Sequence, residues 1–140
     1  DWSARDAAAD RVWIVKSALE DMLAQADRAA PEECCGLLLG RDGVIEEALP
    51  TANVAPEPLG RFGIDPQALI DAHRAERAGG PSILGYFHSH PNGRAEPSAT
   101  DKAMAANDGR VWAIIAGEAI TFWRDDANGF MRLSCTVNDR

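Results

Sequence analysis

The sequence predicts a mixed α/β fold, in which helices flank a mixed β-sheet. Strand and helix patterns alternate through the first part of the chain, and three strand patterns follow one another at its end. The 140 residues are enough for one domain with its own core. We expect residues 1–140 to form that single domain, because no internal repeat, low-complexity tract or convincing linker interrupts them.

The first elements follow directly from local patterns. The apolar stretch RVWIV predicts a strand over 11–15. Ser17 and Glu20 form a capping-box pattern, so a helix is expected from Ser17 to about Ala30, where Pro31 stops it. Two strands are then expected at 35–40 and 44–50, joined by a tight turn at Asp42-Gly43, and the residues Thr51–Arg61 read as a loop.

A second helix pattern begins after this loop. Asp65 is its predicted cap, Pro66 occupies its first turn, and the paired glycines at 79–80 end it. A short buried strand at 82–87 delivers the chain to His88. The remaining patterns predict a third helix and three closing strands, at Ser98 to about Asn107, 111–117, 119–124 and 130–137.

Charge and cysteine content exclude several classes of protein. A formal net charge of −8 argues against nucleic-acid binding, which would require a basic patch. No apolar stretch approaches the about 20 residues needed to span a bilayer. No secretory signal is visible, and the sequence, which begins at Asp1, leaves open whether a leader precedes it. The odd count of cysteines, Cys34, Cys35 and Cys135, indicates no disulfide framework, so we expect a cytoplasmic protein.

The stretch HSHP is the strongest chemical signal in the chain. Side chains two apart on an extended segment point the same way, so His88 and His90 can present their imidazoles to one point while Ser89 points away. Asp101, on the first turn of the third predicted helix, is a possible third ligand. Two imidazoles and a carboxylate, with one position open to water, are a recurring set of zinc ligands.

Each of these features also has a purely structural interpretation. Two histidines at a strand end are more often incidental than metal-binding, and Ser98 with Asp101 makes a capping box by itself. A hydrolase also needs a base, and Glu32 or Glu33 could supply one, although an acidic residue before a strand is usually only solvated. Spacing alone does not choose between these two glutamates.

Taken together, EECCGLLLG and HSHPNGRAEPSATD resemble the JAMM, or MPN-plus, zinc metalloproteases. The family pattern is a glutamate in E-x-C-G, then H-x-H-P, then S-x-x-D. Residues 33–36, 88–91 and 98–101 fill every position of it, and this register selects Glu33 over Glu32. The resemblance covers most of the chain. It implies the MPN fold, a curved mixed sheet between helices related to cytidine deaminases, although the C-x-x-C of a deaminase is missing.

The resemblance also implies a role for each motif residue. His88, His90 and Asp101 would bind zinc, with a water completing the tetrahedron. Glu33 would deprotonate that water and then protonate the departing amine. Ser98 would donate a hydrogen bond to the water or the oxyanion, a role that competes with capping for the same hydroxyl.

Family members cut peptide or isopeptide bonds after the C-terminal tail of ubiquitin-like proteins. The compact chain and short loop favour a prokaryotic peptidase acting on a ubiquitin-like or sulfur-carrier protein. Its tail would enter extended, adding a strand beside a sheet edge, with Thr51–Arg61 as a wall of the groove. The alternatives are an isopeptidase of a bacterial antiviral ubiquitin-like conjugation system and a non-catalytic MPN scaffold. The sequence predicts no oligomeric state.

The resemblance assigns no role to several other conspicuous residues. Cys35 is expected to be a small buried strand residue and not a nucleophile, and Cys34 receives no role. His73 is expected at the border of a buried helix face, and Arg94 is a candidate for meeting a substrate carboxylate. The four tryptophans are expected in the core or at an interface, namely Trp2, Trp13, Trp112 and Trp123.

Overall fold

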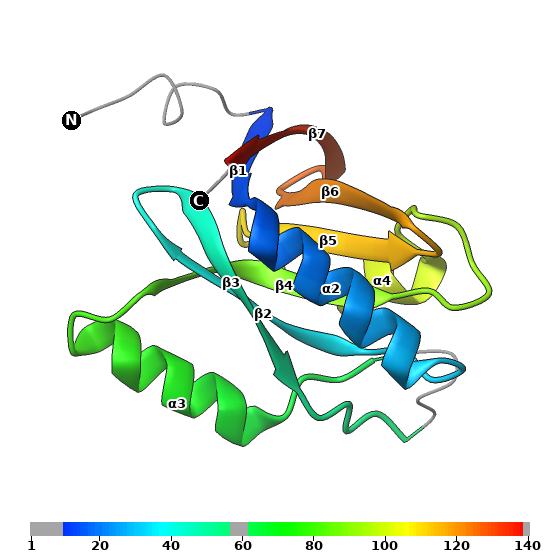
Figure 1. Ribbon diagram of the computed structural model, residues 1–140, viewed down its shortest axis with the longest axis horizontal. Helices are drawn as coiled ribbons and strands as arrows, with labels where there is room; N and C mark the ends of the chain where they lie inside the picture. Colours follow the sequence, from blue (N-terminus) through cyan, green and yellow to red (C-terminus); the bar gives the residue numbers. More distant parts are fainter. Residues whose placement is uncertain (1–9, 57–61, 139–140) are drawn as a thin grey trace.

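A computed structural model describes residues 10–56 and 62–138 of the chain. Trp2 and residues 57–61 of the predicted loop therefore lie outside the described residues. Helices and strands alternate first and strands gather at the end, as the sequence predicts (Figure 1). The elements are β1 (Arg11–Val15), α2 (Lys16–Ala29), β2 (Cys35–Arg41), β3 (Val44–Thr51), α3 (Pro66–Arg77), β4 (Ser82–Ser89), α4 (Ala99–Met104), β5 (Val111–Ala116), β6 (Ala119–Asp126) and β7 (Gly129–Asn138).

The strands form one curved, mixed sheet that closes on itself. Their order is β1-β3-β2-β4-β5-β6-β7, and β1 closes the ring by pairing in parallel with both β3 and β7. The strand β4 lies between β2, to which it is antiparallel, and β5, to which it is parallel. The residues of β4 are all buried or half-buried, which explains its almost continuous run of apolar residues.

The two faces of the sheet pack against different helices. On one face, Phe87 and Ile115 belong to the main core, which also includes Met22 of α2 (Figure 1). On the other face, Leu37 of β2 packs with Ala72 of α3. Because side chains alternate along a strand, His88, next to Phe87, points to this second face. The candidate site therefore lies on the face opposite α2.

The start of α2 differs from the sequence prediction. The helix begins at Lys16, directly after β1, and its N-cap is Val15 in an extended conformation with no side-chain cap. The predicted capping box at Ser17 is therefore wrong. The physical reason is tertiary: Val15 is buried in the main core, which fixes the end of β1 and leaves Ser17 inside the first turn.

The third helix is shorter than expected. It ends at Met104 instead of near Asn107, and Ala105 is already extended. The buried Asp125 of β6 explains this early end, because its Oδ2 accepts the backbone N–H groups of Ala106 and Asn107 at 3.0 and 3.1 Å. These two amides bond to a side chain on the sheet in place of continuing the helix.

Two other local predictions are confirmed. Asp42 and Gly43 both have positive φ, as a tight two-residue hairpin turn requires. Asp65 caps α3 by accepting the Gln67 N–H at 3.1 Å, and Pro66 occupies the first turn. These features depend on neighbouring residues only, so the sequence specifies them without tertiary information.

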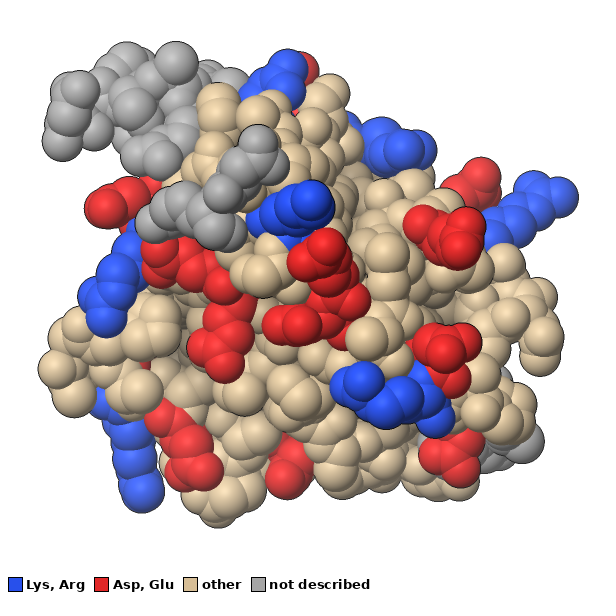
Figure 2. Space-filling view, viewed as in Figure 1, with Lys and Arg blue, Asp and Glu red and all other residues tan. Residues whose placement is uncertain are grey.

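The surface agrees with the acidic composition. Figure 2 shows the face crossed by α2, where acidic and basic side chains both occur and the acidic ones form the larger groups. None of the helices in the described ranges combines the length and the apolar character that crossing a bilayer requires.

Gly85 of β4 lies where the backbones of β4 and β5 approach closely. A Cβ at this position would collide with the backbone carbonyl of Val111 on β5, which cannot move without breaking the β4–β5 pairing. We expect Gly85→Ala to lower the free energy of unfolding by at least about 2 kcal/mol, measured by urea denaturation. Ser82→Ala at the start of the same strand is the control, with an expected change within about 0.5 kcal/mol. Equal urea denaturation midpoints for the two variants would contradict the predicted collision at Gly85.

Candidate metal centre

Two histidines and an aspartate from separate elements meet at one buried point. The Nε2 atoms of His88 and His90 lie 3.0 Å apart. The carboxylate of Asp101 lies 3.1 Å from each of them. All three side chains are buried, with His88 completely inaccessible. The facing atoms of the three groups satisfy one another by hydrogen bonds, as buried polar atoms must.

The strand β4 explains why the two rings point together. His88 lies in register with Cys35 of β2 and Ile114 of β5. Ser89 points to the opposite side, where its Oγ accepts the Cys34 N–H at 2.8 Å. His90 continues the extended path and donates its own N–H to Ile115 at 2.8 Å. The alternation expected from the sequence thus holds one residue beyond the strand.

Asp101 reaches the cluster from the first turn of α4. Ser98 Oγ accepts the Asp101 N–H at 3.0 Å, and Asp101 Oδ2 accepts the Ser98 N–H at 2.9 Å, which completes a capping box. The structural and the functional interpretations of this motif are therefore compatible. The capping box fixes the orientation of the carboxylate that the two imidazoles meet.

The electrostatics keep the cluster ready to bind a cation. Burial acts to raise the pKa of Asp101, but hydrogen bonds from His88 and His90 outweigh it and hold this pKa well below its usual range. Burial lowers the pKa of His88, despite the opposing effect of Asp101. An ionised carboxylate and a neutral imidazole are the forms in which these side chains bind metals.

The donor set fits a divalent ion of the zinc type. Nitrogen and oxygen ligands about 2.0–2.2 Å from a tetrahedral zinc ion lie about 3.3–3.5 Å from one another, close to the 3.0–3.1 Å separations here. The Nδ1 atom of His90 is 2.8 Å from the carbonyl of Arg94, which can only accept, so this nitrogen carries a proton. In a protonated ring, Nε2–H donates to Asp101; in the neutral ring, the Nε2 lone pair is free to bind a metal ion at the same position.

Glu33 lies beside these groups, just before β2. One of its carboxylate oxygens is within 4.8 Å of a ring nitrogen of both histidines, so the three could together hold a metal ion. Because the Asp101 carboxylate is nearer, Glu33 is the better candidate for an unligated neighbour. Burial raises its pKa to about 7, with His90 lowering it and Asp101 raising it. A carboxyl with this pKa can exchange a proton near neutral pH. Glu32 is exposed.

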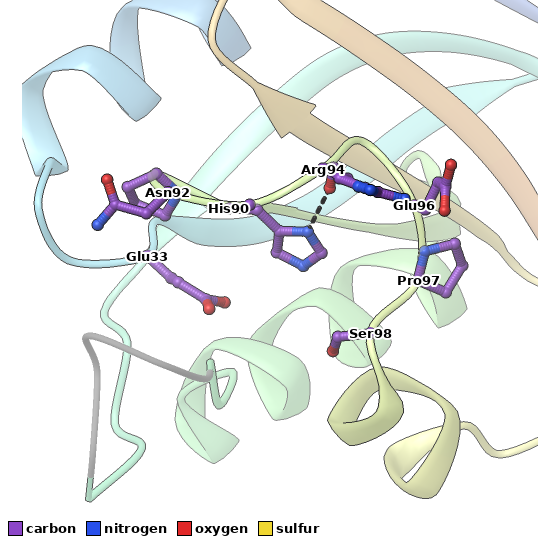
Figure 3. A pocket seen from close by; sticks show the side chains of 9 residues that line it. Glu33, His90, Asn92, Arg94, Glu96, Pro97 and Ser98 are labelled. Atoms are coloured by element: carbon purple, nitrogen blue, oxygen red, sulfur yellow. Dashed lines mark hydrogen bonds between the residues drawn. The ribbon is translucent and has the colours of Figure 1, made fainter.

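A cavity of about 350 Å³ opens at this point. Its lining includes Glu33, His90, Ser98 and the loop residues 91–94, 96 and 97. Figure 3 shows the Glu33 carboxylate and the Ser98 hydroxyl on either side of the His90 ring, directed into the same space. As an acceptor in the capping box, the Ser98 oxygen still has its hydrogen available. Capping and donation to a substrate are therefore not exclusive.

Sequence reasoning missed two residues that shape the site. Asn53 donates to the backbone carbonyl of Glu33 at 3.0 Å, while its Oδ1 accepts the N–H groups of Ala55 and Gly63. The ring of Phe62 stacks on His88 with a centroid distance of 4.1 Å. An asparagine bonding two residues ahead is a recognisable turn signal, but nothing in the sequence links either residue to the histidines.

The remaining candidates take no direct part in the cluster. Cys35 is buried, as predicted, and burial raises the pKa of its thiol to about 11, which makes it a poor nucleophile. Cys34 is half-buried. The side chain of His73 is 44% exposed on α3. Arg94 contributes its carbonyl to the site, and its exposed side chain lies along the cavity (Figure 3).

Comparison with known families identifies this arrangement. The profile of the family described as prokaryotic homologs of the JAB domain matches residues 15–126, which include the glutamate, both histidines, the serine and the aspartate. The chain belongs to this family. The JAMM resemblance of the three motifs is thereby confirmed.

Two curated relatives and one solved structure support the assignment. A Thermus thermophilus protein described as a probable TtuB-protein conjugate cleaving protease is 41% identical over 64% of this chain, but the match spans only 60% of that protein. A desampylase of Haloferax volcanii is 32% identical over 91% of this chain and 96% of its own length. A crystal structure of a JAB1/MPN domain protein from Archaeoglobus fulgidus has a TM-score of 0.61 at 19% identity, covering 90% of this chain and 98% of that one, which confirms the MPN fold.

Proposed function

We propose that this protein is a zinc-dependent peptidase or isopeptidase that cuts after the C-terminal tail of a ubiquitin-like or sulfur-carrier protein. The observation that carries the proposal is the meeting of His88, His90 and Asp101 at 3.0–3.1 Å, with Glu33 and Ser98 facing the adjoining cavity. We take residues 1–140 as one catalytic domain and place it in the cytoplasm.

Each residue has a defined task in this proposal. His88, His90 and Asp101 would hold the zinc ion. A bound zinc ion supplies Lewis acidity, which lowers the pKa of water to about 7. Glu33 takes the proton from the attacking water and delivers it to the nitrogen of the departing amine, a cycle for which a pKa of about 7 is suited. Ser98 donates its free hydroxyl hydrogen to the oxyanion that develops at the scissile carbonyl.

The substrate class rests on the relatives. The Thermus protein is named for cleaving TtuB conjugates and the Haloferax protein is named a desampylase, so both names describe removal of one protein from another. Our proposal extends such cleavage to this chain. The strands of the described residues form a closed ring, but β1 pairs with β3 only at Val44 and Ile45, so the expected addition of the tail beside a sheet edge stays a prediction. We propose that the tail enters beside residues 52–56, where Asn53 bridges to Ile64.

Metal content tests the proposed ligand set. We expect His88→Ala and Asp101→Ala to bind far less than one zinc ion per chain after dialysis, because each removes one of three ligands. His73→Ala is the matched control, since it removes an exposed histidine far from the cluster in sequence, and it should bind zinc as the unmodified protein does. Elemental analysis measures the zinc bound per chain in each variant. Full occupancy in either ligand variant would remove that residue from the set.

The proposed function is tested by incubating the zinc-loaded protein with fusions of ubiquitin-like and sulfur-carrier proteins and locating the cut by mass spectrometry. We expect a cut directly after the tail. Glu33→Gln keeps the size of the side chain but cannot accept a proton, so turnover should fall by at least about 10²-fold while zinc stays bound. Glu32→Gln, at the exposed neighbour, should remain active. Undiminished turnover in Glu33→Gln would eliminate the proposed base.

Ser98→Ala separates the two uses of the hydroxyl. If the hydroxyl donates to the oxyanion, the rate constant kcat should fall by about 10²–10³-fold. Loss of the cap alone would lower stability by about 1 kcal/mol with little effect on kcat. Ser98→Thr retains the hydroxyl and should preserve most of the activity. A kcat within about twofold of the unmodified enzyme in Ser98→Ala would assign this serine to capping only.

A further inference from the structure

The loop between His90 and Ser98 is held in place by a directed series of hydrogen bonds from β6, two strands from β4 on the same face of the sheet. Trp123 Nε1 donates to Thr121 Oγ1 at 2.9 Å. Thr121 Oγ1 donates to the carbonyl of Ala95 at 2.6 Å. An indole N–H only donates and a carbonyl only accepts, so the single hydroxyl hydrogen of Thr121 must go to Ala95. The donor and the acceptor of each hydrogen bond in this series are therefore fixed.

This series of hydrogen bonds ends next to the carbonyl that orients a proposed metal ligand. Ala95 directly follows Arg94, whose carbonyl is 2.8 Å from Nδ1 of His90. The peptide that joins Arg94 and Ala95 is rigid and planar, so fixing the Ala95 carbonyl restricts the direction of the Arg94 carbonyl. A ring held by Nδ1–H presents its Nε2 lone pair to the metal position.

The rest of the loop has little to hold it against the protein. His90, Pro91, Asn92 and Gly93 form a turn closed by the Gly93 N–H donating to the His90 carbonyl at 3.1 Å. Asn92, Gly93 and Arg94 are all exposed. Thr121, in contrast, is buried on β6, beside the end of β5 to which the His90 backbone is attached. The hydroxyl of Thr121 thus attaches an exposed turn to a rigid part of the sheet.

We propose that Thr121, oriented by Trp123, is a positioning residue for the metal centre: it fixes the Arg94–Ala95 peptide and, through it, the ring of His90. The inference rests on the proposed zinc site, but it concerns residues outside the three JAMM motifs. The hydrogen bonds of the Thr121 hydroxyl and the Trp123 indole lead to Ala95 and not to His88, His90 or Asp101, so we trace their effect through the loop. Removing such a support around a metal ligand lowers metal affinity by about 10–100-fold.

The test is zinc affinity, measured on the full chain at 25 °C by competition with a chromogenic chelator. Thr121→Val keeps the shape of the side chain and removes the hydroxyl, and should weaken zinc binding by about 10–100-fold. Thr121→Ser retains the hydroxyl and should restore affinity to within about threefold of the unmodified protein. The control is Thr136→Val on β7, which removes a hydroxyl that accepts a hydrogen bond from Arg11 of β1. The zinc affinity of this variant should not change.

A second measurement begins with the unmodified protein and does not rely on zinc affinity. In the zinc-loaded unmodified protein, ¹H–¹⁵N NMR of the His90 ring should show a protonated Nδ1 whose hydrogen exchanges slowly with water. Trp123→Phe, which removes the indole donor, should accelerate this exchange. The inference is overturned by an Nε2-protonated His90, by unchanged zinc affinity in Thr121→Val, or by equal losses in Thr121→Val and Thr121→Ser. If the unmodified protein binds no zinc, the proposed function fails as well; if it binds zinc and only these comparisons fail, the proposed function stands.

Discussion

The contact between the Asp101 carboxylate and the two imidazoles is the interaction on which the rest of the site depends. An ionised carboxylate is costly to bury unless other groups compensate its charge. Here the two ring nitrogens lie 3.1 Å away, and the Ser98 N–H supplies a third contact at 2.9 Å. The same carboxylate therefore begins α4 and completes the cluster. The side-chain conformation with which Asp101 caps α4 is also the one that directs its carboxylate at the two imidazoles.

This contact also separates the two carboxylates of the site by role. Asp101 is surrounded by donors, and its pKa is held well below the usual range. Glu33 has no comparable compensation, and burial raises its pKa to about 7. Two acidic groups in one site thus take opposite properties from their surroundings, one suited to holding a cation and the other to moving a proton. The cavity brings Glu33 and Ser98 to the same space beside the His90 ring (Figure 3).

Most of the secondary structure could be predicted because it depends on local interactions. The hairpin turn at Asp42-Gly43 and the cap at Asp65 follow from the backbone preferences of those residues. The failures occur where distant groups intervene. Ser17 does not cap α2 because the buried Val15 fixes the end of the preceding strand, and α4 stops early because Asp125 takes the following amides. The closure of the sheet through β1 likewise depends on pairing over a long sequence separation.

The sequence by itself determined the identity of the chemical groups and their local spacing. Strand alternation placed His88 and His90 on one side, and the S-x-x-D spacing placed Asp101 on the first turn of a helix. Only the tertiary structure decided that these groups meet within 3.1 Å and that Thr121 reaches the loop from β6. It also decided that Asn53 holds the backbone of Glu33 and that Phe62 stacks on His88. The physical reason is that such contacts join residues far apart in the chain, whose distances are set by sheet order and register. Periodicity along a single segment carries no information about those distances.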